Sequence, residues 1–475
     1  MLTKEQGYNP YLPAREYVPD GEPYVFDGRL YVFGSHDRFG GTSFCENDYV
    51  LWSTDVHTPT VWKYEGVIYR KGQDPLDPEG IRPLYAPDVE RGADGRFYLY
   101  YSLRGGISVA VADTVTGPYE FHGHVVTPDG SRFGIGDGTP MASDPAVLLD
   151  SDGRCFLYCG YDPNSEGELA SVKKHSKLYE GSFCVELNPR DMRTVIGEAR
   201  IIVPGKEISA GTGYEGYEFY EASSIRRIGK TYYFIYSSKE SHDLCYATSH
   251  RPDRDFVFGG RIVSIGDLGL PGVTHPRAPL GNTHGSLCCV EGDWFVFYHR
   301  QTNDSPCCRQ ACAENITIAT DGSIAQVEVT SCGLNRAPLH GKGTYDARIA
   351  CNLYNECPDA PAPYVTQSGE DDDETAEQYV TRLSNGGVVG FKYFSFDGTN
   401  QSLAVRYRGN PNGRLLVLTD APNQSPITVL CLNETNETNE WCDAHANFTP
   451  PTGTHAIFFR FEGEGCADLR SFTLL

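Results

Sequence analysis

Five polar residues recur at matching positions along the first 300 residues of the chain. Each precedes the glycine of an expected turn by seven to nine residues; they are Asp20, Asp88, Asp144, Glu221 and His284. Four carboxyl groups and one imidazole gathered in one place would oppose one another's ionisation, because like charges disfavour joint ionisation. Such a cluster either binds a cation or performs acid–base catalysis with separated pKa values. One Asp before Gly or Pro is ordinary turn chemistry, but five aligned positions favour a shared site.

The residues after each of these positions predict a β-hairpin. Two runs rich in aromatic and β-branched residues flank a turn centred on glycine, which is the pattern of two antiparallel strands. The hairpins are expected at 20–34, 88–102, 144–159, 221–237 and 284–298, with further strands at segments such as 49–53 and 106–112. Four strands in each of five units predict a five-bladed β-propeller. The equivalent ends of its inner strands converge on one mouth, which would bring the five polar residues together.

The composition changes near residue 335. A loop-like stretch over 331–343 and an acidic surface run over 368–374 are followed by short strand patterns at 387–394, 401–407, 414–418 and 455–461. Strands spaced in this way predict a β-sandwich, here of the jelly-roll kind. We therefore expect an all-β protein with a propeller over 1–335 and a sandwich over 336–475, since 475 residues exceed one ordinary domain.

The charge balance argues against nucleic acid or a membrane as a partner. The chain has 63 acidic and 40 basic residues, a formal charge of −23, and no clustered Lys and Arg for binding phosphate. No stretch reaches the roughly 18 apolar residues of a membrane span. The first seven residues contain no apolar signal segment. A cytoplasmic location is therefore expected, and the oligomeric state stays open.

The 16 cysteines are expected to be reduced. They are spread over a large chain, and many lie inside apolar strand patterns, where a free Cys behaves as a small hydrophobic residue. Cys307, Cys308 and Cys312 form a cluster that could be read as a metal site. That alternative is weaker, because the cluster lacks paired CxxC elements of matching spacing.

Short motifs around the five positions resemble those of family 43 glycoside hydrolases. They follow the family's order across residues 10–330: Pro19-Asp20-Gly21-Glu22-Pro23, Tyr85-Ala86-Pro87-Asp88, Ser143-Asp144-Pro145-Ala146, Tyr220-Glu221-Ala222-Ser223-Ser224, His284-Gly285-Ser286 and Tyr298-His299-Arg300. The region from Ile349 to the carboxyl terminus is similar to a family 6 carbohydrate-binding module.

The resemblance implies an inverting glycoside hydrolase that uses three carboxyl groups. Asp20 is then the general base that activates a water, and Glu221 is the general acid that protonates the leaving oxygen. Asp144 is the third carboxylate, which raises the pKa of the acid and orients it. Inversion requires base and acid roughly 6.5–9.5 Å apart, and the chemistry requires no cofactor.

Further residues are expected to contact the sugar. Asp88 would bind substrate or shape the pocket, and Arg300 would bridge Asp20 and a sugar hydroxyl, with a surface ion pair as the alternative. The aromatic candidates for a sugar platform, with core packing as their alternative, are Tyr85, Phe39, Trp52 and Phe219. His284 is expected at the substrate and, as in relatives, beside a structural calcium in the propeller channel. Calcium prefers oxygen ligands, so one imidazole supports that ion only weakly.

The expected substrate is an arabinose- or xylose-containing oligosaccharide. The phrase over 217–226 resembles arabinofuranosidase-type members, which implies exo-acting release of terminal α-L-arabinofuranosyl units. A β-D-xylosidase of the same mechanism is the close alternative. A lectin-like propeller that binds sugar without cleaving it is the alternative from another class. The three retained carboxyl positions argue against it, because a lectin needs neither a proton donor nor a base.

Overall fold

The inner hairpin of every predicted blade is present in the computed structural model, which describes residues 6–174, 177–371, 373–433 and 440–475. The antiparallel pairs are β1 (Glu22–Phe26) with β2 (Arg29–Phe33), β5 (Asp88–Arg91) with β6 (Phe97–Leu103), β9 (Ala146–Leu149) with β10 (Cys155–Cys159), β13 (Phe219–Ile228) with β14 (Thr231–Ser238), and β17 (Ser286–Val290) with β18 (Asp293–Thr302). In the first turn Asp27 and Gly28 have φ of 48° and 76°, the positive values that a tight type I′ turn requires. The predicted hairpins are confirmed.

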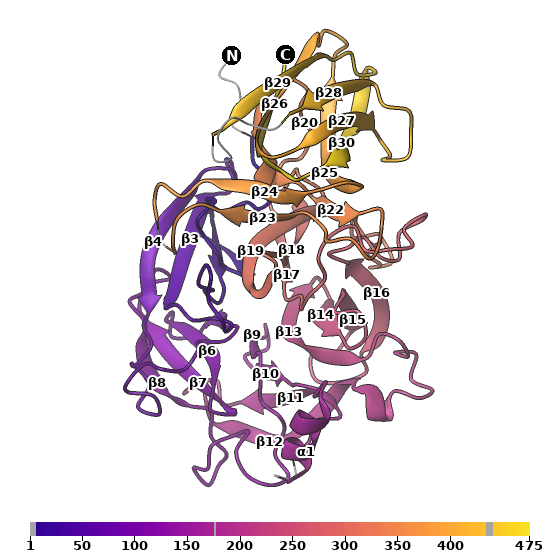
Figure 1. Ribbon diagram of the computed structural model, residues 1–475. Helices are drawn as coiled ribbons and strands as arrows, with labels where there is room; N and C mark the ends of the chain where they lie inside the picture. Colours follow the sequence, from indigo (N-terminus) through magenta and orange to yellow (C-terminus); the bar gives the residue numbers. More distant parts are fainter. Residues whose placement is uncertain (1–5, 175–176, 372, 434–439) are drawn as a thin grey trace.

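Outer strands complete the blades around a central axis (Figure 1). They are β3 (Tyr49–Asp55) and β4 (Trp62–Tyr69), β7 (Gly106–Ala112) and β8 (Glu120–His124), β11 (Gly181–Leu187) and β12 (Val195–Pro204), β15 (Leu244–Ser249) and β16 (Val257–Val263), and in the fifth blade β19 (Ser305–Ile316). The amino-terminal segment closes the ring on β19. Asn9 accepts a hydrogen bond from the Ala313 N–H at 2.9 Å and donates one to its carbonyl at 2.9 Å. The fold is a five-bladed β-propeller.

The propeller core lies between neighbouring blades, where alternate side chains of facing strands pack together. Trp52 and Phe219 belong to this core, with 4% and 0% of their surface exposed. Trp52 also donates its indole N–H to Glu16 Oε2 at 3.0 Å. The prediction that these two aromatic residues form a sugar platform is therefore wrong, because their strands turn them into the blade interfaces.

The carboxyl-terminal part is a sandwich of two six-stranded sheets. One sheet contains β20 (Leu339–His340), β22 (Asn352–Asn355), β25 (Gly387–Phe396), β27 (Asn412–Thr419), β28 (Thr428–Leu432) and β30 (Gly453–Glu464). The other contains β21 (Gly343–Asp346), β23 (Tyr364–Gln367), β24 (Gln378–Leu383), β26 (Ser402–Gly409), β29 (Cys442–Asn447) and β31 (Ala467–Leu474). Phe391, Phe459 and Phe472 pack between the sheets. The last propeller strand ends at Ile316 and the first sandwich strand begins at Leu339, and the predicted boundary at 335 falls between them.

Buried polar contacts join the two parts. Lys392 of β25 pairs with Asp267 at 2.9 Å and with Glu328 at 2.7 Å, and only 1% of its surface is exposed. Arg300 of β18 donates to the carbonyl oxygens of Ala350 and Arg348 at 2.5 and 2.6 Å. Arg300 is therefore a junction residue. Its predicted bridge between Asp20 and sugar is wrong, because its side chain points to the sandwich.

All 16 cysteines are free thiols, and most of them are buried. Cys307, Cys308 and Cys312 lie on β19 as buried side chains. Among the described residues, no group of three or more His, Cys, Asp or Glu side chains is arranged to hold a metal ion. No helix in the described ranges is both long and apolar enough to cross a membrane. Most of the amino-terminal stretch used for the location prediction lies outside those ranges.

Candidate active site

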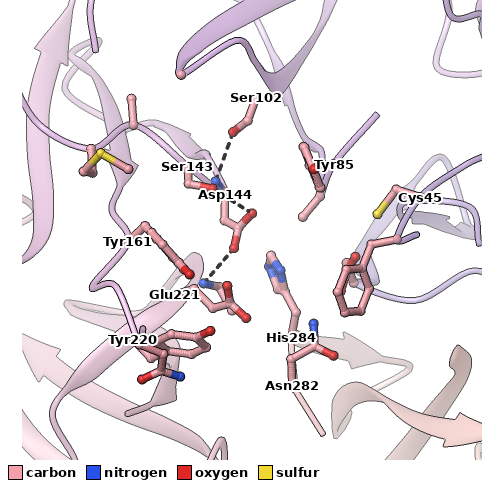
Figure 2. Close-up of a pocket in the computed structure, with 18 of the residues that line it drawn as sticks. Cys45, Tyr85, Ser102, Ser143, Asp144, Tyr161, Tyr220, Glu221, Asn282 and His284 are labelled. Carbon is pink, nitrogen blue, oxygen red and sulfur yellow. Dashed lines mark hydrogen bonds between the residues drawn. The ribbon is translucent and has the colours of Figure 1, made fainter. Parts of the chain in front are cut away.

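A pocket of about 610 Å³ opens at one mouth of the propeller. Asp20, Asp144, Glu221 and His284 all line it, so four of the five aligned residues do meet. Figure 2 shows Asp144, Glu221 and His284 pointing into the same space. The loops before β1, β9 and β17 carry the two aspartates and the histidine, whereas Glu221 is the third residue of β13.

Local backbone conformation aims these side chains at the pocket. Asp20 and Asp144 have φ of 59° and 44°, in the left-handed region that non-glycine residues seldom adopt. Ala222, directly after Glu221, has φ of 68°, and the pairing of β13 with β14 is irregular between Glu221 and Ser224. Such strained residues and bulges gather where a side chain must be redirected.

The second blade departs from the predicted alignment. Asp88 is the first residue of β5 and is fully buried, with Tyr24 Oη donating to its Oδ1 at 2.5 Å and the Val147 N–H donating to its Oδ2 at 2.8 Å. The residue two positions earlier, Ala86, lines the pocket instead. The prediction that Asp88 contacts substrate is therefore wrong. Counting back from the turn glycine therefore misplaced Asp88, which lies two residues beyond the position that lines the pocket.

Asp20 is held as a carboxylate by buried donors. Arg309 Nη1 donates to its Oδ1 at 2.9 Å, and the Ser35 hydroxyl donates to its Oδ2. The backbone N–H of Asp20 donates to Nδ1 of His299 at 3.2 Å, and Nε2 of that ring lies 2.8 Å from the Asn282 carbonyl oxygen. Burial by itself raises the pKa of Asp20, but the charges of Arg309 and His284 and the Ser35 hydrogen bond together outweigh it, so its pKa lies below the ordinary value.

Arg309 also lines the pocket, although it was not among the site residues predicted from the sequence. Its Nε and Nη2 donate to the two carboxylate oxygens of Asp37 at 2.8 and 2.9 Å, while Nη1 reaches Asp20. The Phe44 ring lies against the guanidinium, 4.9 Å from its centroid. A signal was present in the sequence, because an arginine in the middle of the apolar, Cys-rich run 307–313 needs a buried anionic partner.

Glu221 has the opposite environment. Burial, followed by the charges of Asp144 and Asp20, raises its pKa to about 8. Asp144 Oδ2 accepts the backbone N–H of Ala222 at 3.0 Å, which fixes the backbone beside Glu221. Burial also raises the pKa of Asp144, and Asp20 adds to that rise. At neutral pH the pocket therefore holds a protonated Glu221 and an ionised Asp20.

His284 lies between the pocket and a charged network below it. Its Nε2 is 3.7 Å from Glu22 Oε1, and neither atom has a hydrogen-bond partner among the described residues. Burial lowers the pKa of His284, but Glu22 and the pocket aspartates outweigh it and raise the pKa to about 9. The protonated, positively charged form of His284 is therefore favoured by the three acidic side chains that raise its pKa, Glu22, Asp20 and Asp144.

Among the described residues, His284 and the acidic side chains near it do not form a ready-made calcium site. Calcium takes six to eight oxygen ligands. Here one carboxylate oxygen of Glu22 faces His284, and its other oxygen already accepts a hydrogen bond from the Arg226 guanidinium. Arg226 also donates to Leu287 O at 3.1 Å and lies over the Tyr24 ring at 4.4 Å. The Arg226 guanidinium thus places a permanent positive charge in the channel.

The aromatic lining differs from the predicted one. Of the candidates only Tyr85 lines the pocket, where Phe44, Tyr161 and Tyr220 also lie. Phe39 packs against Tyr17 with ring centroids 5.6 Å apart and does not line the pocket. Its predicted place in the platform is therefore wrong, because the loop turns inward only after it, at Phe44. Tyr220 directly follows the buried Phe219, so strand alternation decides which ring faces the pocket.

Comparisons with known proteins find matches for both parts of the chain. Residues 53–324 match the family model for glycosyl hydrolases family 43, and residues 364–474 match that for carbohydrate binding module (family 6). A protein of Thermoclostridium stercorarium named "Xylosidase/arabinosidase" is 46% identical, covering 99% of this chain and 99% of its own length. "Xylosidase/arabinosidase 43A" of Humicola insolens is 30% identical, covering 60% of this chain and 88% of its own length.

Among solved structures, a glycoside hydrolase family 43 arabinoxylan arabinofuranohydrolase from Bacillus subtilis, in complex with cellotetraose, shares the fold. The TM-score is 0.53 at 21% identity, over 98% of this chain and 97% of that one. The likeness thus extends over both the propeller and the sandwich.

Proposed function

Because the chain belongs to glycoside hydrolase family 43, we propose that it releases terminal α-L-arabinofuranosyl units from plant-derived oligosaccharides by an inverting, exo-acting mechanism. The family makes it a hydrolase of the xylosidase and arabinosidase group. The observation that carries the mechanism is the division of roles in one pocket, with the pKa of Asp20 below its ordinary value and that of Glu221 at about 8.

In the proposed reaction, Glu221 gives its proton to the glycosidic oxygen as the bond from that oxygen to the anomeric carbon breaks. A water attacks the anomeric carbon from the opposite face and loses its proton to Asp20. The sugar leaves with inverted configuration. The proton on Asp20 then returns to solvent, and Glu221 takes one up. Each carboxyl group thus ends in its starting state.

Asp144 and His284 support this division. Asp144 holds the Ala222 N–H and places a negative charge beside Glu221, which keeps the acid protonated. His284 faces the pocket carboxylates from the axis, and its positive charge lowers the pKa of Asp144. These neighbours keep the proton that the proposed reaction needs on Glu221.

β-D-xylosidase activity of the same mechanism is the second candidate. It is favoured by the relative that matches the chain over 99% of both lengths, whose name joins both activities. β-D-xylopyranosyl and α-L-arabinofuranosyl units differ in ring size, so the pocket would select between them by shape. The lectin-like alternative has no use for a buried acid with a pKa of about 8.

Hydrolysis of 4-nitrophenyl α-L-arabinofuranoside and 4-nitrophenyl β-D-xyloside tests substrate choice, and proton NMR of the first product tests stereochemistry. We expect faster release from the arabinofuranoside and initial formation of the β anomer of arabinose. A faster xyloside would select the second candidate. Initial formation of the α anomer would overturn the assignment of Asp20 as the base.

A pair of isosteric variants separates the two roles. Glu221→Gln should lose most activity on arabinoxylan oligosaccharides and retain more on the nitrophenyl substrate, whose leaving group needs little protonation. Asp20→Asn should lose activity on both, because water activation is needed for either leaving group. Equal losses on both substrates for Glu221→Gln would contradict its role as the acid.

We propose that the chemistry needs no resident metal, since Arg226 and His284 supply positive charge in the channel. Dialysis against a chelator should then leave the rate unchanged, and restoration of a lost rate by calcium would contradict this.

We also propose a cytoplasmic location, supported by the 16 free cysteines. Cell fractionation tests it, and activity recovered outside the cell would count against it.

A further inference from the structure

The acidic run of the sandwich reaches into the propeller. Asp371, which follows β23, accepts the backbone N–H of Phe39 on Oδ1 at 2.7 Å and the Asn47 side-chain amide on Oδ2 at 3.0 Å. Both donors belong to the propeller loop 36–48, more than 300 residues earlier in the chain. Both carboxylate oxygens of Asp371 are thus used to hold one loop of the other domain. Hydrogen bonds to a charged acceptor are about twice as strong as neutral ones.

The loop that Asp371 holds forms a wall of the pocket. Phe44 and Cys45 line the cavity, and the Cys45 N–H donates to Asp37 Oδ1 at 3.0 Å. Asn47 spans the base of the loop, since its amide also donates to the Asp37 carbonyl at 3.1 Å and its N–H donates to the His36 carbonyl at 3.0 Å. Asp371 therefore secures the loop at the residue that also holds the Asp37 backbone.

From Asp37 the contacts continue to the base. Its carboxylate accepts two hydrogen bonds from the Arg309 guanidinium, and the third arm of that guanidinium donates to Asp20. Asp37 and Arg309 are buried, at 0% and 2% exposure. A shift of Asp37 would therefore move the guanidinium that keeps Asp20 ionised.

The segment that carries Asp371 is itself anchored. The Val365 carbonyl accepts the Asn303 N–H at 2.7 Å. Gln367 Oε1 accepts the Tyr17 hydroxyl at 2.6 Å, and Gln378 Nε2 donates to the same hydroxyl oxygen at 3.0 Å. The side chains of Tyr17, Gln367 and Gln378 are buried between the domains, where β23 and β24 run along the propeller (Figure 1). The segment that carries Asp371 is thus attached to the propeller by hydrogen bonds on both of its strands.

We propose that Asp371 is a positioning residue for the hydrolytic reaction, through which the sandwich domain completes the active-site wall by holding the loop of Phe44 and Cys45 and, through Asp37 and Arg309, the base Asp20. The sandwich would then contribute to catalysis apart from any sugar it binds itself. The proposal rests on the role of Asp20 as the base.

The test compares Asp371→Ala with Asp373→Asn in the full chain. Asp373 lies in the same acidic run, but its Oδ1 accepts hydrogen bonds from Thr375 of its own turn. We expect Asp371→Ala to reduce kcat/KM about tenfold on arabinofuranosyl substrates. The acid limb of its pH profile should move to higher pH, because a displaced Arg309 no longer lowers the pKa of Asp20. Asp373→Asn should match the wild type in both.

A purely structural role would lower the thermal midpoint of Asp371→Ala without moving the pH profile, and that result would overturn the proposal. A double-mutant cycle adds a second measurement. If Asp371 acts through Asn47, the loss in kcat/KM for Asn47→Ala with Asp371→Ala should be smaller than the product of the single losses. Independent losses would count against it. A wild-type chain that hydrolyses neither arabinofuranosides nor xylosides would instead refute the proposed function.

Discussion

Asp20 and Glu221 lie in one pocket, yet their neighbours favour opposite protonation states. Arg309 and Ser35 donate to Asp20, whereas Glu221 is buried beside Asp144. The difference comes from side chains that are distant in sequence, since Arg309 lies on β19 of the fifth blade and Asp144 precedes β9 of the third. The two proposed catalytic roles are therefore distinguished by neighbouring side chains rather than by residue type.

The alkaline limb of the pH profile should report Glu221. Because its pKa is about 8, kcat/KM on arabino-oligosaccharides should fall above that pH as the acid loses its proton. In Asp144→Asn the neighbouring negative charge is gone, the pKa of Glu221 falls, and the limb should move to lower pH. A pH profile of kcat/KM for both proteins, extended well to either side of neutrality, checks both statements. An unmoved limb in Asp144→Asn would show that Asp144 does not tune the acid.

Arg309 should matter more to catalysis than Arg300. Arg309→Lys replaces a planar fork that contacts two carboxylates with a single ammonium group, so we expect kcat to fall on the order of a hundredfold, about 2.7 kcal/mol. Arg300→Lys is the matched control from the neighbouring strand. The Arg300 side chain contacts two backbone carbonyls at the junction. Arg300→Lys should therefore lower the melting temperature and leave kcat nearly unchanged. Similar kcat values for the two variants would contradict this assignment.

At the scale of elements, the five inner strands meet around the Arg226 guanidinium. It contacts Glu22 and Tyr24 of β1 and the Leu287 carbonyl of β17, while Asp88 of β5 links Tyr24 to the Val147 N–H of β9. Burial raises the pKa of Asp88, and Glu22 raises it further, to about 7. Asp88, which was predicted from the sequence to bind substrate, thus links neighbouring blades of the propeller.

Loss of the channel cation should destabilise the propeller. Arg226→Met leaves the Glu22 carboxylate buried without its partner, which costs about 3–5 kcal/mol in comparable cases. Arg154→Met removes an exposed pair with Asp152 and should cost at most about 1 kcal/mol. Thermal unfolding of both variants beside the wild type measures the difference. A melting temperature of Arg226→Met equal to that of Arg154→Met would show that the network does not hold the blades together.

At the scale of the whole molecule, the two domains are joined by buried ionic and hydrogen-bonded contacts. Lys392 is enclosed by two propeller carboxylates, and its pKa lies above the ordinary value because those anions outweigh the effect of burial. Arg300 and Asp371 cross the same junction in opposite directions. A junction of this kind favours unfolding of both domains together.

Calorimetry of the full chain should therefore show one cooperative transition. Lys392→Met should lower its midpoint, because Asp267 would be left buried without the ammonium group. Lys173→Met, which removes an exposed pair with Glu207, serves as control and should change the midpoint little. Two separate transitions in the wild-type chain would show that the domains unfold independently.

The residue pattern alone was enough to predict the five hairpins and the strands named in the sandwich, since a period-two apolar pattern and a turn glycine specify a hairpin wherever it lies. The equivalent positions before these turns also predicted that Asp20, Asp144, Glu221 and His284 meet, and all four line one pocket. The resemblance to family 43 then supplied an expected role for each of the three carboxyl groups, which the structure places in one pocket.

The neighbours that complete the site can be identified only in the folded protein. Arg300 pairs with Gln310 and Arg309 pairs with Gln301, so the two arginines stand one step apart in one ladder and point to opposite faces. One faces the sandwich and the other faces Asp20. The choices of Ala86 over Asp88 and of Phe44 over Phe39 depend likewise on where a strand begins and where a loop turns inward. A shift of one residue along a strand turns a side chain to the opposite face, and a shift of a few residues along a loop displaces it. Composition and spacing do not specify such shifts.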